Sequence, residues 1–529
     1  MHQLHFDKHR SKGMKSRRVM VTIASVLVTG ASLAGCSGPS GGSDEPVGEP
    51  KSGGTLSWAM IGETQSMDPA ICGAVAYQRC SPVFGTLLRY DTETEKFVPY
   101  LAESFESADG QNWTLKLRER VTFSDGTPFD AAAVAFNWDR IKNPQTLSPS
   151  ARATDGMTWR VVDPRTVSVT LESPNYQLPW QLVKGLGAIG SPTAIEAAGT
   201  EVGSKPVGAG PFVLAKWTRN SQMELTRNPT YFEAGLPYLD GLTTKVINSD
   251  DQRLNALRSG EIDIDTSMLT KDAETVADEG AFDVYDTPLV GGNGVMFNFE
   301  DPAIQDQSLR QAILHAIDGA QIVDAVFPGG SQADSFLNSD GSSDAAYPEL
   351  DLKEAQRLFD DYLKRTGKTG ETISLMTYAG FPVMEQTSQL LQAQLQQIKG
   401  LTLQLDPLDA PTLLQRKRQG EYQIMATSNI SADLDTLYDL FHSKGSLNTM
   451  GYSNPKVDEA LQITRTSENP DEVTKAYQVV NDELSKDAPF RIWQHNSGYL
   501  FADDRVQGIS IVPTGAGPAW DWEQAWLDD

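Results

Sequence analysis

Segments typical of strands alternate with segments typical of amphipathic helices along most of this chain, and no short repeat connects them. GGTLSWAM (53–60) alternates apolar and polar residues like a strand, and TWRVVDPRTVSVTLES (158–173) has the pattern of two strands around a turn at Asp163-Pro164. Strands and helices that alternate without a repeat period predict α/β lobes rather than a solenoid.

Several segments have the apolar spacing of helices. In SLRQAILHAIDGAQIVDAVF (308–327) apolar residues recur at helical spacing from Leu309 to Val323. This spacing predicts a helix with one buried face, and Ser308 is the expected N-cap. Further amphipathic helices are predicted at 131–141, 388–398, 455–464 and 473–486.

The first 35 residues have the order of an export signal. A basic stretch with Arg17 and Arg18 precedes an apolar run from Val19 to Leu33, and that run ends just before Cys36. The run of about 15 residues is too short for a membrane-spanning helix, which needs about 20. The residues before Cys36 resemble the lipobox of bacterial lipoproteins, so 1–35 is predicted to be a lipoprotein signal peptide and Cys36 the lipidation site. A plain secretory signal is the alternative, and the arginine pair leaves Sec or twin-arginine export open.

Length, charge and the tract behind Cys36 set further limits. Residues 36–53 are rich in Gly, Ser and Pro and predict a flexible tether to a membrane. Roughly 490 residues remain after the leader, which is enough for two or three domains. The net charge of −26 argues against a nucleic-acid partner. No second apolar run approaches membrane length, so we expect a soluble body outside the cytoplasm.

Besides Cys36, the chain contains only Cys72 and Cys80. Outside the cytoplasm two nearby cysteines are more often paired than free, so a disulfide between them is predicted. The alternative is that both are small buried residues.

The sequence contains no clear catalytic constellation. The histidines outside the leader, His315, His442 and His495, lie far apart in sequence and form no metal motif. Gly367-Lys368-Thr369 looks like the end of a phosphate-binding loop, but Tyr362 stands where the first glycine is required. We therefore predict a protein that is not an enzyme and has no cofactor or metal site, although a hydrolase that uses an acidic pair stays open.

Several blocks in order resemble one family from Gly53 onward. They are GGTLSWAMIGETQSMDPA, LAESFESADGQNWTLKLRERVTFSDGTPFDAAAVAFNWDRI, PVGAGPFVLAKWTRNSQMELTRNPTYF, ALRSGEIDI, SLRQAILHAIDGAQIV and GYSNPKVDEAL. The chain resembles the extracellular solute-binding proteins of family 5, which are the dipeptide, oligopeptide and nickel receptors of ABC importers.

The resemblance implies a two-lobed α/β fold of the periplasmic-binding-protein kind, with an extra domain inserted in the first lobe. The implied limits are 54–96, 206–288 and 495–529 for the first lobe, 97–205 for the extra domain and 289–494 for the second lobe. Two crossings between the lobes would form a hinge, and closure on a solute would be a rigid-body motion.

The resemblance also implies a partner for the ammonium of a peptide. In the family's peptide receptors an aspartate holds this group, and Asp433 stands at the matching position in TSNISADLDTLYDLF (427–441). Ile430 replaces the expected tryptophan, and Thr436 replaces a proline. The alternative is that Asp433 caps the following helix.

The other implied ligand contacts come from three places. The loop from about Cys72 to Tyr77, with Gly73 and Ala74, matches the first-lobe rim of the cleft. Met296 and Asn298 are expected to face the cleft from the second lobe, although methionine is more commonly a core residue. Arg418 could reach a peptide carboxylate.

Taken together, these features predict a monomeric, lipid-anchored binding protein of the cell membrane. It would capture peptides or a similar polar solute and deliver them to an ABC permease and ATPase. A nickel chelate or an oligosaccharide is an alternative solute, and a lipid-anchored hydrolase or a surface sensor is an alternative function.

Overall fold

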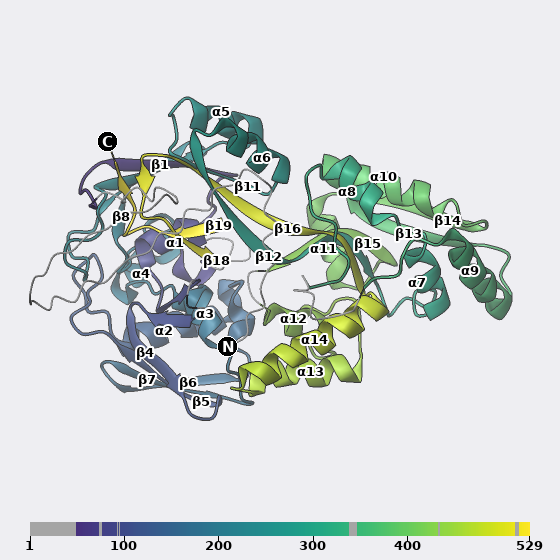
Figure 1. Ribbon diagram of the computed structural model, residues 1–529. Helices are drawn as coiled ribbons and strands as arrows, with labels where there is room; N and C mark the ends of the chain where they lie inside the picture. The colour runs from purple at the N-terminus through teal and green to yellow at the C-terminus, as the bar shows by residue number, and fades with distance from the viewer. Residues whose placement is uncertain are drawn as a thin grey trace, which may run out of the picture.

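The structure is a computed structural model that describes residues 49–72, 77–92, 94, 96–337, 346–431, 434–513 and 518–528. The predicted signal peptide, Cys36 and most of the tether lie outside these residues. Figure 1 shows two bodies, and two long paired strands, β12 (Phe282–Phe297) and β16 (Phe490–Asp503), run from one body to the other.

Both bodies share one ten-stranded sheet. Its order is β14-β13-β15-β12-β16-β11-β1-β10-β9-β8. On the first-lobe side the strands are β11 (Ile264–Ser267), β1 (Thr55–Met60), β10 (Gly241–Val246), β9 (Gln222–Arg227) and β8 (Phe212–Thr218). On the second-lobe side they are β14 (Leu401–Leu408), β13 (Glu371–Tyr378) and β15 (Ile424–Ser431). The strand predicted at 53–60 is therefore confirmed as β1, which pairs in parallel with β10.

The extra domain has a sheet of its own. Four antiparallel strands follow the order β4-β5-β7-β6, and β6 and β7 confirm the strand pair predicted around Asp163-Pro164. The bounds are β4 (Ala102–Ser107), β5 (Asn112–Leu117), β6 (Met157–Asp163) and β7 (Thr166–Leu171), with α2 (Ala131–Lys142), α3 (Pro179–Val183) and α4 (Pro192–Ala198). The small hairpin β2 (Leu88–Asp91) and β3 (Lys96–Pro99) precedes it.

The remaining first-lobe elements lie around the large sheet. They are α1 (Tyr77–Phe84), α5 (Asp250–Arg258), α6 (Thr270–Glu279) and the C-terminal strands β17 (Val506–Gln507), β18 (Ser510–Pro513), β19 (Pro518–Asp521) and β20 (Trp526–Leu527). The second-lobe helices are α7 (Gln307–Leu314), α8 (Gly319–Val326), α9 (Leu352–Thr366), α10 (Pro382–Leu395), α11 (Ala410–Arg418), α12 (Thr436–Phe441), α13 (Pro455–Thr466) and α14 (Pro470–Asp487). Of these, α2, α10, α13 and α14 confirm the four further helices predicted from spacing.

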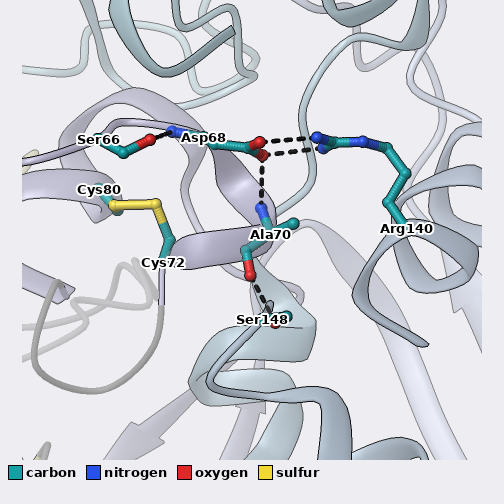
Figure 2. Close-up of a disulfide and its surroundings, with 7 residues drawn as sticks. All are labelled: Ser66, Asp68, Ala70, Cys72, Cys80, Arg140 and Ser148. Carbon is teal, nitrogen blue, oxygen red and sulfur yellow. Dashed lines mark hydrogen bonds and ion pairs between the residues drawn. A yellow bond between two sulfur atoms is a disulfide. The ribbon is translucent and has the colours of Figure 1, made fainter. Parts of the chain in front are cut away.

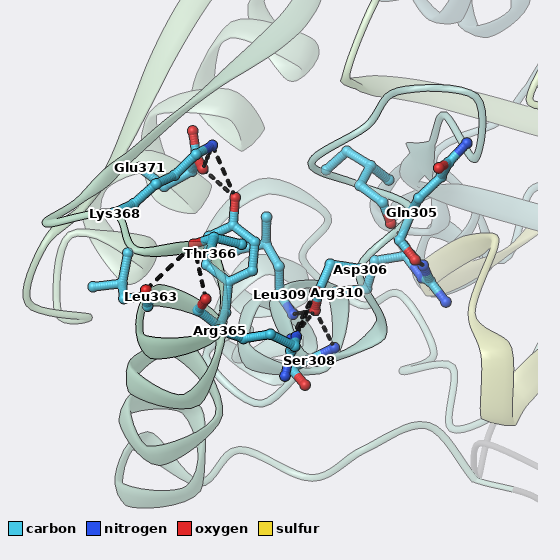
Figure 3. Close-up of polar contacts among 12 residues, drawn as sticks. Gln305, Asp306, Ser308, Leu309, Arg310, Leu363, Arg365, Thr366, Lys368 and Glu371 are labelled. Atoms are coloured by element: carbon cyan, nitrogen blue, oxygen red, sulfur yellow. Dashed lines mark hydrogen bonds and ion pairs between the residues drawn. The ribbon is translucent and has the colours of Figure 1, made fainter.

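The helix predicted over 308–327 is two helices. Helix α7 ends at Leu314, and α8 begins at Gly319 because the Asp318 carboxylate caps it by accepting from the Gln321 amide at 2.9 Å. The N-cap of α7 is Asp306, not Ser308. Figure 3 shows why Asp306 is well placed: its carboxylate accepts from the amides of Ser308 and Leu309 and also pairs with Arg365 at 2.6 Å.

The former phosphate-loop candidate ends a helix. Gly367 is the C-cap of α9 in the left-handed region, with φ of 70°. The Lys368 ammonium pairs with the Glu371 carboxylate (Figure 3). It also donates to the Tyr362 hydroxyl at 3.2 Å. This local pairing supports the exclusion of a phosphate-binding loop.

The hydrophobic cores follow the same division. One cluster of buried residues contains only residues between Val295 and Trp493, in the second lobe. A second cluster is formed mainly by the extra domain, from Ala70 to Ala209, and a third belongs to the large sheet of the first lobe. A binding site is therefore expected among the polar groups that lie between these cores.

Candidate functional site

The two crossing strands come exceptionally close at a run of glycines. The pairing of β12 with β16 shifts between Pro288 and Gly292, and again between Asn293 and Gly294. A Cβ on Gly292 would lie 1.7 Å from the carbonyl oxygen of Gln494, and Gly291 has a φ of 86°. Only glycine fits this approach, so the Gly-Gly-Asn-Gly run fixes where the strands change register between the lobes.

Polar side chains connect three strands at this crossing. The Asn293 amide donates to the Asn496 side-chain oxygen at 2.9 Å, and the Asn496 amide donates to the Ser428 hydroxyl at 3.3 Å. Beside them, burial lowers the pKa of His495 to about 4, so this imidazole is neutral at pH 7. The crossing is thus a polar but uncharged seam between β12, β15 and β16.

The carboxyl ends of parallel strands meet at the same sheet edge. Strands β13 and β15 are parallel and end at Tyr378 and Ser431, and β12 runs antiparallel to β15, with Val290 opposite Ser431. Ligands of open α/β sheets bind at such carboxyl edges. Asp433 follows β15 by two residues and lies outside the described residues.

The segment after Asp433 contains a buried ion pair. The Arg465 guanidinium donates to both carboxylate oxygens of Asp435, at 2.6 and 3.1 Å, and lies 3.6 Å above the ring of Tyr438. The side chains of Asp435 and Arg465 are 6% and 17% exposed. The N-cap position of α12 is Asp435, two residues after Asp433. The position at which this helix begins therefore does not favour Asp433 as its cap.

The first-lobe rim is held by a network shown in Figure 2. The Asp68 carboxylate caps the short 3-10 helix Pro69–Ile71 through the Ala70 amide and accepts from both terminal nitrogens of Arg140, at 2.9 and 2.7 Å. The sulfur atoms of Cys72 and Cys80 lie at bonding distance, 2.02 Å. Gly73 and Ala74, between these cysteines, lie outside the described residues.

The predicted contacts Met296 and Asn298 lie elsewhere. Both are only 2% exposed, and Met296 is part of the second-lobe core. The Asn298 amide donates to the carbonyls of Gly420 and Tyr422 at 2.9 and 2.7 Å. Met296 lies two residues beyond Gly294 of the crossing, and Asn298 follows Phe297, the last residue of β12. The burial of both side chains favours a scaffold role over the predicted contact with the cleft.

Arg418 lies two residues before Gly420, whose carbonyl accepts from the Asn298 amide. It is the last residue of α11, its side chain is exposed, and burial lowers the pKa of its neighbour Lys417. A cavity of about 520 Å³ opens nearby, lined by Asn298, Glu300, Asp301, Pro302, Ser374, Arg416, Gly420, Glu421, Tyr422 and Gln423. The structure therefore separates Arg418 from the carboxyl edge that Asp433 follows.

Two further observations concern the residues that the structure describes. No group of three or more His, Cys, Asp or Glu among them could hold a metal ion. None of the helices within the described ranges is long and apolar enough to cross a membrane.

The fold defines the class of protein first. The structure superposes on PBP AgaA from A. tumefaciens R10, solved with agropinic acid, with a TM-score of 0.76 and 24% identity over 90% of this chain and 99% of that one. It also superposes on the periplasmic binding protein DppA of Helicobacter pylori, solved with the peptide STSA, with a TM-score of 0.75 and 23% identity over 90% and 99%. The chain therefore has the fold of a two-lobed α/β binding protein.

The sequence then identifies the family. The model of the bacterial extracellular solute-binding proteins, family 5 middle region, matches residues 96–484, and the chain belongs to this family. It is also 28% identical over 412 residues to the glutathione-binding protein GsiB of Shigella flexneri serotype 5b, covering 74% of this chain and 79% of that protein.

Sequence reasoning missed the polar seam at the crossing. Its signal in the sequence is the glycine-rich run from Gly291 to Gly294. The asparagine within that run, Asn293, finds its partner Asn496 about 200 residues later, and no local pattern connects the two.

Proposed function

We propose that this solute-binding protein captures a peptide or a similar polar solute between its two lobes and delivers it to the permease of an ABC importer. The observation that carries this proposal is the pair of crossing strands, β12 and β16, which join two bodies with separate cores at a glycine-rich register shift. Such a joint suits closure around a solute, provided that the solute binds the closed form more tightly than the open one.

The comparisons support a proposal for the chemical nature of the solute. GsiB is named for glutathione, and DppA was solved with a peptide, so a short peptide is the first candidate. We propose that Asp433 accepts the ammonium of this peptide, because it follows the carboxyl edge of β15. Gly73 and Ala74 remain the proposed first-lobe contacts.

The proposed site predicts stabilisation by a matching solute. The mature chain should melt at a higher temperature with glutathione or the peptide Ser-Thr-Ser-Ala, because a ligand at a hundred times its dissociation constant stabilises the folded state by about 2.7 kcal/mol. Asp433→Asn should reduce the shift, whereas the exposed control Asp482→Asn should not. A nickel–histidine complex tests the alternative solute. Melting temperatures that no probe moves would refute capture of these solutes.

Attachment to the membrane is a separate proposal. We infer that Cys36 carries lipid, from the signal-like leader and the Gly- and Ser-rich tract behind it. Cys36→Ser should release the protein from the membrane fraction of cells. A variant that stays in that fraction would contradict the anchor without bearing on solute capture.

A further inference from the structure

The two lobes meet at a second place, away from the crossing strands. In Figure 1, α13 extends toward the extra domain. The Tyr176 amide donates to the carbonyl of Arg465 at 2.7 Å, and the Gln177 side chain donates to the carbonyl of Thr464 at 3.1 Å. Nearby, the Arg152 guanidinium donates to the carbonyl of Ser446. All three acceptors are main-chain oxygens of the second lobe.

The end of α13 is well suited to accept these bonds. The last four carbonyls of a helix have no partner within it, and they carry the negative end of the helix dipole. Helix α13 ends at Thr466, so Thr464 and Arg465 are in this last turn. The extra domain thus supplies donors where the second lobe has unpaired acceptors.

The donors on the extra domain are held in position before they meet the second lobe. The Asn175 amide donates to the Gly110 carbonyl, and the Asn175 side-chain oxygen accepts from the Gln177 amide, both at 2.8 Å. The ring of Tyr176 lies so close to Gly110 that a Cβ there would approach it to 2.8 Å. This turn is therefore preorganised, which lowers the entropic cost of the contact.

Both sides of this contact connect to the candidate site. On the second lobe, the side chain of Arg465 is bound by Asp435, two residues after Asp433. On the extra domain, Arg152 lies four residues after Ser148, whose hydroxyl donates to the Ala70 carbonyl at 2.5 Å, next to the rim that leads into Cys72. A shift of the segment after Asp433, or of the segment that leads into Cys72, would therefore be transmitted directly to this contact.

We propose that Arg152, Tyr176 and Gln177 form a latch that stabilises the closed arrangement of the lobes and sets how long a solute stays bound. The inference rests on the proposed capture of a solute by closure. The latch contacts three main-chain oxygens and, through the Tyr176 hydroxyl, the side chain of Glu468. None of these groups is a proposed solute contact, so the strength of the latch can change while the solute contacts stay the same. Loss of two of its bonds should speed release about fivefold to thirtyfold, which is the effect of one or two net hydrogen bonds.

The test compares Arg152→Ala/Gln177→Ala with a matched control. Arg160→Ala/Gln145→Ala removes the same side-chain types from exposed positions of the same domain. Small-angle scattering measures the radius of gyration of the solute-free mature chain. Stopped-flow dissociation uses glutathione or Ser-Thr-Ser-Ala, whichever raises the melting temperature. Circular dichroism checks that all variants are folded.

A larger radius of gyration, or faster dissociation of the probe, confined to the latch variant supports the proposal. If neither quantity changes, or if the control changes equally, the latch is refuted. The scattering measurement needs no solute, so a failed latch is distinguishable from a failed proposal of solute capture, which would show as melting temperatures that no probe moves.

Discussion

At the scale of single residues, the most unusual group is a carboxylate buried beside the C-terminal strands. Glu523 is 2% exposed and pairs with Arg89, which also lies 3.4 Å from Asp521. Burial raises the pKa of Glu523 to about 7, while Arg89 opposes the rise and Asp521 adds to it. One guanidinium thus pairs with two carboxylates, so ionisation of both carboxylates at once destabilises the folded state.

This cluster predicts a pH dependence of stability. A carboxyl whose pKa is higher in the folded than in the unfolded state contributes stability below its unfolded pKa, near 4.5, and loses it as the pH rises to about 7. Wild type should therefore lose about 1–3 kcal/mol of folding stability between pH 4.5 and pH 7. In Glu523→Gln the melting temperature should fall less over this pH range. Melting curves from pH 4.5 to 8 measure this, with the exposed Glu106→Gln as control. Equal slopes in all three proteins would contradict the assignment.

At the scale of elements, β12 is the strand on which both lobes depend. Gly291 needs a positive φ, and Gly292 and Gly294 lie so close to β16 that a Cβ would come within 2.2 Å of its carbonyl oxygens. The strand therefore approaches β16 most closely in its middle. Strand β16 pairs along nearly all of β12, whereas β15 pairs only with its second half.

The close approach predicts a strong effect of one added methyl group. Gly292→Ala should destabilise the folded state by about 3 kcal/mol or more, because main chain has to move to admit the Cβ. Gly280→Ala is the control: its φ is 65° and nothing lies within 4 Å of a Cβ, so the backbone conformation alone should cost about 1 kcal/mol. Thermal unfolding measures the loss of stability in both variants. A melting temperature of Gly292→Ala equal to that of the control would show that the crossing can relax.

At the scale of the whole molecule, the two lobes and the extra domain have hydrophobic cores of their own but have to act together. The extra domain is connected to the first lobe by the ion pair between Arg140 on α2 and Asp68, whose side chains are 21% and 9% exposed. Since Asp68 also caps the segment that leads into Cys72, this pair couples the position of the domain to the rim.

Removal of this pair should loosen the extra domain. Arg140→Met leaves the Asp68 carboxylate buried without its guanidinium, which should cost about 2–4 kcal/mol. Calorimetry should show a lower or broadened transition, and Arg160→Met on the exposed face of β6 should leave the transition unchanged. A transition of Arg140→Met that matches wild type would mean that the pair contributes little.

Much of the fold follows from sequence patterns, whereas the site depends on distant pairings. The helical spacing of apolar residues was enough to predict α13 and α14, and the alternation of apolar and polar residues was enough to predict β1. Each of these elements buries one face, and the buried face sets the sequence pattern. The break between α7 and α8 was missed because the apolar spacing continues through it, while Asp318 starts a new helix.

The predicted contacts at Met296 and Asn298 depended on packing that a sequence pattern does not give. Met296 is on β12, the strand that enters the second lobe, and Asn298 follows its last residue, but both side chains are buried. For Asp433, the strand end before it was predictable, whereas its own surroundings were not.

The shared sheet has a consequence for how the chain reaches its folded state. Strand β16 is made from residues close to the C-terminus, and it fills the place between β11 and β12 that neither neighbour can close without it. Pairings this distant in sequence form slowly. Neither half can therefore complete its part of the sheet before residues 490–503 have been made, and this one segment completes both halves together.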